Sequence, residues 1–281
     1  WLRPRDDRAF SEARKALYRA VPAAARLHRL ALWARLEAYY PLVFGSLHDH
    51  ARFVDRRAAR DMRAQLTDPA LQDAVVPSYR VGCKRVLLSD DWLPTLERPD
   101  VELVTTPIRQ VTPGGVLLED GREVGLDVLI CATGYRVDDP LGDLAVHGEG
   151  GLGLREAWGD RPSAWMGMAV PRFPDLFLIL GPNTALGHSS VILMIEAAAR
   201  YAAQAVRHGL VVGPRTVRTD AAEAFERWAD DAHGEHVWSS GCRSWYQNAA
   251  GVNYTLWPGS TWSYIRRTHT FDPSVYRPAS M

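Results

Sequence analysis

The sequence predicts an α/β protein in which helices come first and short β-strands follow. Apolar residues recur at helical spacing through residues 1–75, and from Pro77 onward short β-rich runs alternate with turn signals. Two largely apolar runs, residues 126–132 and 176–180, are typical of strands that are buried on both faces. At 281 residues, the chain is long enough for one large domain or two ordinary ones.

Three helices are expected within residues 1–75. Ser11 can cap a first helix that runs to Val21. Residues 23–40 carry apolar side chains near helical spacing, and Pro41 is expected to stop that helix because proline has no N–H to donate. A third helix is expected over residues 55–66. The opening quarter of the chain is therefore predicted to be helical.

The next segment is predicted to be a β-meander followed by a buried strand. The expected strands cover residues 86–88, 101–105, 116–119 and 126–132. Turn signals separate them at residues 112–115 and 120–121. The last of these strands ends in Thr133-Gly134-Tyr135, a turn of small residues. This order suits a dinucleotide-binding α/β domain.

A second strand–loop–helix unit follows at residues 175–209. The strand 176–180 leads into a loop with two glycines and a proline, and a long helix is expected from about Ser190, with Gly209 as its stop. A helix start presents unpaired N–H groups and a partial positive charge to whatever lies before it. The unit is either a site for an anionic or electron-rich ligand or an ordinary crossover. A further helix over residues 221–232 and an aromatic-rich tail over 238–264 come after it.

Composition narrows the class of protein. The chain carries 33 basic and 33 acidic residues, so its balance does not argue for nucleic acid or a membrane surface as partner. No apolar run reaches the length of about 18 residues that a membrane span requires. Cys83, Cys131 and Cys242 lie far apart with no C-x-x-C pair, which predicts neither a disulfide framework nor a zinc site. A reducing compartment, the cytoplasm, is expected.

Three short motifs match known functional patterns only in part. Residues 148–153 (GEGGLG) match G-x-G-x-x-G, but no buried strand of useful length precedes them, so a flexible loop is expected. Residues 187–191 (GHSSV) resemble a hydrolase nucleophile elbow, but the last glycine is missing and Ser189 is not at the end of a strand. His48 and His50 form H-x-H without a supporting carboxylate or cysteine motif, so core or surface histidines are expected.

Lys84 and Arg85 form the most informative pair of charges. Lysine is rare in this chain, since Lys15 is the only other one. Two adjacent cations that open a β segment could hold a phosphate and a second negative group. The alternative is a pair of exposed charges on a loop.

Several motifs in register carry a family resemblance. They are residues 82–86 (GCKRV), 98–104 (RPDVELV), 126–135 (LDVLICATGY), 180–184 (LGPNT), 186–191 (LGHSSV), 244–246 (SWY) and 256–260 (LWPGS). Together they closely resemble the C-terminal half of Baeyer–Villiger monooxygenases and the wider class B flavin monooxygenases. The resemblance covers nearly the entire chain.

The resemblance implies a two-dinucleotide-binding flavoprotein fold with a helical insert, and FAD and NADP as cofactors. In that family NADPH reduces the flavin, O2 adds to it, and the resulting flavin peroxide attacks a ketone to give an ester or lactone. The implied domains are a helical insert over residues 1–75, the second half of the NADP-binding domain over 76–138, and the C-terminal part of the FAD-binding domain with its tail over 139–281.

Individual roles follow where the motifs match. Lys84 resembles the lysine that recognises the 2′-phosphate of NADP, and Arg85 the arginine that stabilises the anionic peroxyflavin. The resemblance also implies cofactor-binding roles for three further groups. A domain-linking turn contains Ala132, Thr133 and Gly134, and a flavin-facing loop with the following helix start contains Gly181, Pro182, Asn183, Ser189 and Ser190. The third is an active-site tryptophan, Trp245. A tryptophan in a tail is otherwise most often a core residue.

The chain also departs from the family pattern. The family has two G-x-G-x-x-G strands, one for each cofactor, and neither is found in this sequence, which begins at Trp1. The isolated 281-residue chain is therefore expected to be inactive and to bind little FAD. Two alternatives stay open: a related flavin monooxygenase that oxygenates amines or sulfides, and a non-catalytic fragment.

Overall fold

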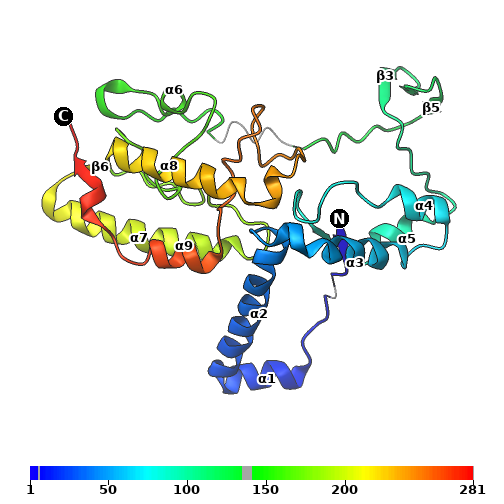
Figure 1. Ribbon diagram of the computed structural model, residues 1–281, viewed down its shortest axis with the longest axis horizontal. Coiled ribbons are helices and arrows are strands. Elements are labelled where there is room, and N and C mark those ends of the chain that lie inside the picture. The colour runs from blue at the N-terminus through cyan, green and yellow to red at the C-terminus, as the bar shows by residue number, and fades with distance from the viewer. Residues whose placement is uncertain (6, 135–140, 281) are drawn as a thin grey trace.

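The computed structural model describes residues 1–5, 7–134 and 141–280. Figure 1 shows two groups of elements, the N-terminal helices with a small β-hairpin sheet at one side and the helices α7, α8 and α9 at the other. These three helices span Val191–Val212, Thr219–Gly234 and Thr261–Arg267. Within the described residues, the strands form small sheets of two, three and two strands. The chain is α/β, as predicted.

The N-terminal quarter is helical, as predicted. Its helices are α1 (Glu12–Ala20), α2 (Pro22–Val43), the 3₁₀ turn η1 (His48–Ala51), α3 (Arg52–Arg63) and α4 (Pro69–Ala74). Ser11 caps α1, since its hydroxyl accepts a hydrogen bond from the N–H of Arg14 at 3.3 Å. This satisfies one of the N–H groups that a helix start leaves unpaired.

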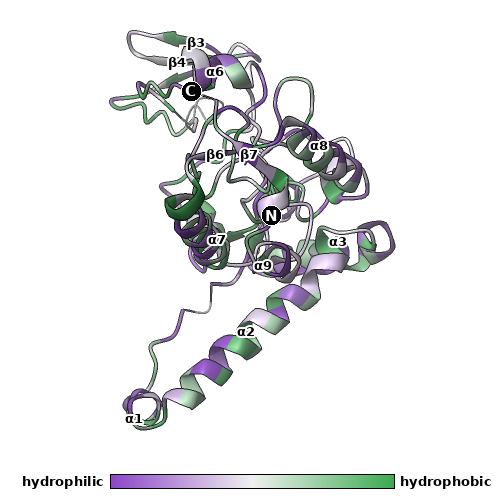
Figure 2. Ribbon diagram, turned by 90° about the vertical axis from the view of Figure 1, so that its left-hand side faces the viewer, coloured by the Kyte–Doolittle hydropathy of each residue, from purple (hydrophilic) through white to green (hydrophobic). Residues whose placement is uncertain are grey.

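Helix α2 continues through Pro41, so the predicted stop at that residue is wrong. Pro41 lies in the last turn, where the missing N–H removes a single hydrogen bond and the helix ends at Val43. None of the residues of α2 is buried, and Leu27 is 66% exposed. Figure 2 shows α2 extending away from the other elements with hydrophilic and hydrophobic residues along its length.

The helices α3 and α4 enclose a small core with the short strands β1 (Leu2–Arg3) and β2 (Leu87–Leu88), which pair in parallel. Helix α5 (Trp92–Leu96) completes this core. The indole of Trp1 donates a hydrogen bond to the carbonyl of Tyr79 at 2.9 Å. The chain segment that leads to Lys84 is therefore attached to both β1 and the helical core.

An antiparallel meander is present. Its strands are β3 (Ile108–Thr112), β4 (Gly115–Leu118) and β5 (Glu123–Gly125), with Val116 opposite both Val111 and Val124. Only β4 matches a strand predicted for the meander, and the strands on either side of β4 were not predicted. The turn signals at residues 112–115 and 120–121 connect these strands, as predicted. The strand predicted over residues 101–105 is wrong, since that segment forms no strand.

The two buried strands predicted over residues 126–132 and 176–180 are also wrong. Residues 126–132 form no strand, and Val128 and Ile130 are 73% and 82% exposed. In the second run, Phe177 alone forms an isolated bridge, with Ala169. A strand requires a hydrogen-bonded neighbour along its length, and the described residues supply only single contacts, such as the N–H of Leu126 to the carbonyl of Gly114 and that of Leu178 to the carbonyl of Met168. Tyr135 and the domain boundary expected after residue 138 lie outside the described residues.

The largest core lies in the C-terminal half, where α7 packs against α9. It is built from Met, Ala and aromatic side chains, with Tyr201, Trp257 and Tyr264 almost fully buried. Helix α6 (Leu154–Trp158) has a satellite core, and β6 (Arg215–Val217) pairs with β7 (Tyr276–Pro278). Helix α8 confirms the helix predicted over residues 221–232.

Helix α7 does not stop at Gly209, contrary to prediction. Glycine in a helix interior costs only about 1 kcal/mol relative to alanine, so the helix can pass through it. Gly213 ends the helix instead, in a positive-φ conformation (φ 88°) that glycine adopts without a side-chain clash. The glycine-rich run at residues 148–153 forms the short 3₁₀ turn η2 (Glu149–Gly151), whose Glu149 pairs with Arg277 at 2.6 Å.

Candidate active site

The segment that carries Lys84 and Arg85 is anchored just before the two cations. The guanidinium of Arg80 pairs with Asp55 of α3 at 2.5 Å, and the other carboxylate oxygen of Asp55 accepts the N–H of Val81 at 2.8 Å. Lys84 and Arg85 themselves are exposed, and neither forms an ion pair within the described part of the chain. Two free cations on an anchored segment can bind an anionic ligand.

The cations lie beside aromatic side chains. The ammonium of Lys84 stands 4.7 Å from the ring centroid of Tyr79, within cation–π range. Burial raises the pKa of Tyr246, and the positive charge of Arg85 partly offsets that rise, so Arg85 faces the tail segment. Trp245, 46% exposed, contacts the ring of Tyr246 at 4.5 Å between centroids. The segment of Lys84 and Arg85 therefore lies near the tail segment that carries Tyr246 and Trp245, although the two segments are far apart in the sequence.

The cysteine prediction requires a correction at this point. Cys83 and Cys242 lie side by side, with their Cα atoms 6.3 Å apart, within the range of a disulfide. The expectation of no disulfide framework rested on spacing in the sequence, and 159 residues separate these two. Cys131 is a separate, exposed cysteine. The pair places the residue before Lys84 against the loop that carries Trp245.

The loop with Gly181, Pro182 and Asn183 is held by hydrogen bonds to residues 253–256 of the C-terminal tail. Asn183 is 3% exposed and has a positive φ of 56°. Its side-chain amide donates to the carbonyls of Asn253 and Leu256 at 3.2 Å each, and its own N–H donates to Tyr254 at 2.7 Å. A buried amide with these partners fixes the loop.

Gly181 permits a close approach between two loops. A Cβ at this position would lie 2.4 Å from the carbonyl oxygen of Gly167, closer than any side chain could tolerate. Glycine is therefore required here for packing.

The serines behave as the sequence predicted for a helix start. Ser190 is the N-cap of α7, and its hydroxyl accepts from the N–H of Ile192 at 3.3 Å. Ser189 lies beside it, half-buried. The first turn of α7 carries no acidic side chain, so its partial positive charge is not neutralised within that turn.

Sequence reasoning missed the polar contacts that tie α2 to this helix start. His188 donates through Nε2 to the carboxylate of Glu37 at 3.1 Å, and both side chains are largely buried. The hydroxyl of Thr261, the first residue of α9, donates to the same carboxylate oxygen. Burial by itself raises the pKa of Glu37, but these hydrogen bonds outweigh it and the pKa lies below its usual value. One carboxylate therefore joins α2, the segment just before α7, and α9, and no local sequence motif predicts this link.

A second buried polar group lies between α2 and α8. His236 Nδ1 faces the carbonyl of Ala232, so that nitrogen carries the proton and Nε2 accepts from the hydroxyl of Tyr40 at 2.5 Å. Burial lowers the pKa of His236. Burial, with the nearby His236, lowers the pKa of His233 to about 3, so both histidines are neutral at neutral pH.

Ala132, Thr133 and Gly134 are not brought to the others. All three are exposed, and in the described part of the chain no backbone hydrogen bond joins them to the remaining predicted residues. Gly134 has a positive φ of 96° with open space around it, as expected of a turn. Their role as a domain link stays a prediction.

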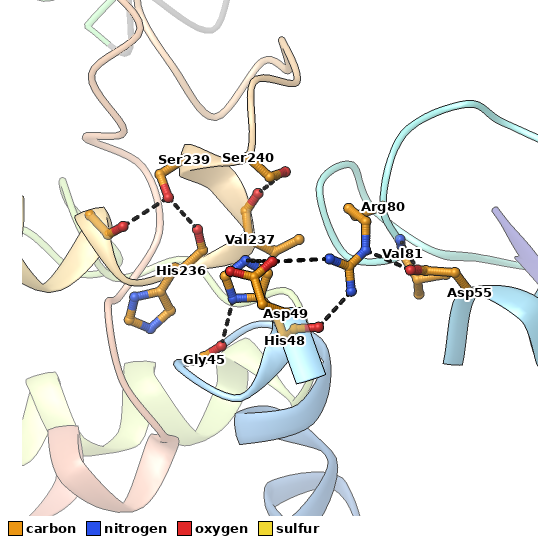
Figure 3. Close-up of polar contacts among 11 residues, drawn as sticks. Gly45, His48, Asp49, Asp55, Arg80, Val81, His236, Val237, Ser239 and Ser240 are labelled. Atoms are coloured by element: carbon orange, nitrogen blue, oxygen red, sulfur yellow. Dashed lines mark hydrogen bonds and ion pairs between the residues drawn. The ribbon is translucent and has the colours of Figure 1, made fainter. Parts of the chain in front are cut away.

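A polar cavity of about 440 Å³ lies on the other side of this region, between η1 and the 3₁₀ turn η3 (Val237–Ser239). Its lining is polar: Ser46, His48, Asp49, Gly234, Glu235, Ser239 and Ser240. Figure 3 shows that its wall is continuous with the Arg80 contacts, because Arg80 also reaches Asp49 at 3.3 Å. None of the residues predicted from sequence lines this cavity.

Two features are absent from the described residues. They contain no group of three or more His, Cys, Asp or Glu side chains arranged to hold a metal ion. None of their helices is both long and apolar enough to cross a membrane.

Curated proteins resemble the chain along almost its whole length. A Baeyer–Villiger monooxygenase of Streptomyces coelicolor is 38% identical over 99% of this chain and 55% of its own length. One of Pseudomonas aeruginosa is 36% identical over 98% and 53%. The FAD-binding monooxygenase ktnD of Aspergillus niger is 33% identical over 94% and 45%. The chain thus spans about half the length of the curated relatives it matches. No family model matches it.

Solved structures show the same fold. Cyclohexanone monooxygenase from Rhodococcus sp. Phi1, bound to NADP+, aligns with a TM-score of 0.70 and 23% identity over 81% of this chain and 44% of that protein. An oxidised steroid monooxygenase bound to NADP gives 0.71 and 21% over 86% and 47%. The OTEMO complex with FAD and NADP gives 0.70 and 21% over 80% and 44%. At these identities the likeness concerns the fold.

Proposed function

We propose that the chain forms part of an FAD- and NADPH-dependent monooxygenase of the Baeyer–Villiger type, on the strength of its sequence similarity to curated enzymes of that name. The reaction proposed is the insertion of one oxygen atom from O2 into a ketone, which yields an ester or lactone. The observation that carries the proposal is the 38% identity along 99% of the chain to a Baeyer–Villiger monooxygenase.

The residues present fit the two cofactors. Bound FAD and NADPH would supply the redox chemistry. Lys84 offers an exposed, unpaired ammonium for the 2′-phosphate of NADP, and Arg85 offers a guanidinium that stays protonated at any working pH. A permanent cation beside the reacting atoms stabilises negative charge without giving up a proton. The N-terminus of α7, capped by Ser190, would add a partial positive charge that also stabilises negative charge on the cofactor.

The aromatic pair Trp245 and Tyr246 would form the wall nearest Arg85. Trp245 is exposed enough to contact a ligand, whereas Tyr246 is buried and supports it from behind. A wall of this kind excludes water and orients the ligand. The ketone itself is a proposal, and an assay with paired ketone and amine substrates separates it from amine or sulfide oxygenation.

The decisive variant is Arg85→Ala in the full-length protein that contains this chain. We expect FAD to stay bound and product formation to be lost, because the anion-stabilising charge is gone. Arg109→Ala is the matched control, since Arg109 is an exposed arginine on β3. Ester formation by Arg85→Ala at the rate of the Arg109→Ala control would remove the assigned role of Arg85.

We further propose that the 281 residues alone bind little FAD. The support is the exposure of apolar side chains that suit the interior of a sheet that the described residues do not complete. They are those of Leu126, Val128, Leu129, Ile130, Ile179 and Leu180. The same proposal includes the absence of the two glycine-motif strands from these 281 residues. It also includes the division into domains after residues 75 and 138. A flavin absorbance band near-stoichiometric with the purified chain would contradict it.

A cytoplasmic location is proposed as well, and the pairing of Cys83 with Cys242 provides its test. A cytoplasmic protein is held in a reducing environment. Alkylation of thiols before cell lysis, followed by peptide mass spectrometry, should then find both cysteines alkylated. A Cys83–Cys242 cross-link under these conditions would count against the location.

A further inference from the structure

Phe44, the C-cap residue that follows α2, lies where three separate segments of the candidate active site meet. Its side chain is 5% exposed. It belongs to a buried cluster of residues from distant parts of the chain: Cys83, Val237, Trp238, Tyr246 and Leu256. The neighbouring α2 residue Tyr40 stacks on it at 6.4 Å between ring centroids.

The first segment is the turn before the two cations. A Cβ placed on Gly82 would lie 2.9 Å from Cγ1 and 3.0 Å from the carbonyl oxygen of Val43, and 3.1 Å from Cε1 of Phe44, so the end of α2 packs closely against this turn. Gly82 has a φ of 91°, a conformation that suits glycine. Lys84 and Arg85 follow directly, so the ring of Phe44, together with its neighbour Val43, limits the position of this turn.

The second segment is the loop before α7. A Cβ on Gly187 would lie 2.6 Å from Cε1 and 3.1 Å from Cζ of Phe44. The ring of His188 lies 5.8 Å from that of Phe44. Ser190, the cap of α7, is two residues further along. The ring of Phe44 therefore occupies the space that any side chain at position 187 would need.

The third segment leads to Trp245. The carbonyl of Phe44 accepts the N–H of Val237 at 3.0 Å, and the ring of Trp238 lies 5.9 Å from that of Phe44. The indole of Trp238 donates to the carbonyl of Gly82 at 3.2 Å, so the third segment also contacts the first. The same α2 end is fixed through Glu37 and Tyr40, as described above.

We infer that Phe44 is a positioning residue that sets the mutual geometry of Lys84–Arg85, the start of α7 and the loop of Trp245. It acts by shape, because its ring fills the space between backbones that come within van der Waals contact. The inference rests on the proposed function for its catalytic consequence, but the geometry can be measured without it.

A size exchange between Phe44 and Gly187 tests the inference. Phe44→Leu removes Cε1 and Cζ and leaves a gap, and Gly187→Ala adds a Cβ that collides with those atoms. Gly187 is not among the positive-φ glycines, so alanine introduces no backbone strain there. In the double variant the added methyl group occupies the space that the shortened side chain vacates. The exchange should therefore restore what each single variant loses.

Two readouts report on the geometry in the full-length protein. The first is the rate at which diamide oxidises reduced Cys83 and Cys242 to a disulfide; diamide takes up the two electrons and two protons that the thiols lose. Cys131→Ser in every variant removes the competing thiol. The second is the amount of oxygenated product per NADPH consumed. Phe53→Leu, an exposed phenylalanine of α3, is the matched control.

Each single variant should slow cross-linking and reduce product formation about tenfold or more, because a misplacement of about 1 Å can cost up to about 10²-fold. The double variant should recover most of both. Single variants that match Phe53→Leu in cross-linking, or a double variant no better than the worse single one, would overturn the inference. If no variant and no parent protein forms oxygenated product, the proposed function fails while the cross-linking rates still decide the role of Phe44.

Discussion

Replacing Asn183 tests whether the loop beneath α7 is held by the buried amide. Asn183→Ala removes the hydrogen bonds to the carbonyls of Asn253 and Leu256 and places alanine at a φ of 56°. An unsatisfied buried acceptor costs about 1–3 kcal/mol, and a left-handed conformation costs a residue with a Cβ about 1–2 kcal/mol. The free energy of unfolding should therefore fall by about 2–5 kcal/mol.

Asn183→Gly separates the two contributions. Glycine loses the same hydrogen bonds but adopts the positive φ without a steric cost, so it should be about 1 kcal/mol more stable than alanine at this position. Urea unfolding of the full-length protein, followed by tryptophan fluorescence, measures both values. Equal stabilities for the two variants would refute the backbone argument. A loss below about 1 kcal/mol in both would refute the hydrogen-bond argument.

Three further predictions concern charge and capping. Lys84→Ala should raise the KM for NADPH at least about tenfold and leave the KM for NADH unchanged, since a charge-assisted phosphate contact is worth about 1.5–3 kcal/mol. An equal rise in KM for both coenzymes would remove the 2′-phosphate assignment. Burial lowers the pKa of His233 to about 3 and also lowers the pKa of His236, so the stabilising effect of both is complete above about pH 6.5 and declines as the pH falls below that value, toward about 3 for His233. Acid titration should show stability declining across this window, and His233→Gln should make the decline shallower. An unchanged slope would count against burial as its cause. Ser190→Ala should destabilise the protein by about 1 kcal/mol, with Ser190→Asp close to the parent; thermal melting of both variants decides, and equal melting points for alanine and serine would remove the cap.

The helices were predictable because their signals are local. Ser11 caps α1 and the periodicity of residues 221–232 gives α8, and both signals lie within a few residues of the element. Their ends were less predictable, since Pro41 and Gly209 disfavour a helix by amounts that packing can outweigh. The helix α2 ends at Val43 and α7 at Val212.

The two apolar runs at 126–132 and 176–180 show the limit of pattern reasoning. Their composition is that of buried strands, but a strand exists only with a neighbour to accept its hydrogen bonds. Within the described residues no neighbour runs along the length of either segment, and Ile130 is 82% exposed as a result. The composition of a segment therefore predicts the environment it needs, while the partner must come from elsewhere.

The candidate site divides in the same way. Lys84 and Arg85 were singled out from the sequence because adjacent cations form a local motif, and their roles stay predictions. Their supports were not singled out, since Asp55, Glu37 and Phe44 reach the site from the helical segment across long stretches of sequence. Such contacts depend on tertiary packing and leave no pattern in the chain.

The most direct measurement is the fate of molecular oxygen. The full-length protein that contains this chain would be incubated with NADPH, a panel of linear and cyclic ketones and ¹⁸O₂, and the products analysed by mass spectrometry. A Baeyer–Villiger monooxygenase inserts one oxygen atom from O2, so the ester or lactone should carry a single ¹⁸O. Consumption of NADPH without ester, or ester that lacks the label, would contradict the proposed function.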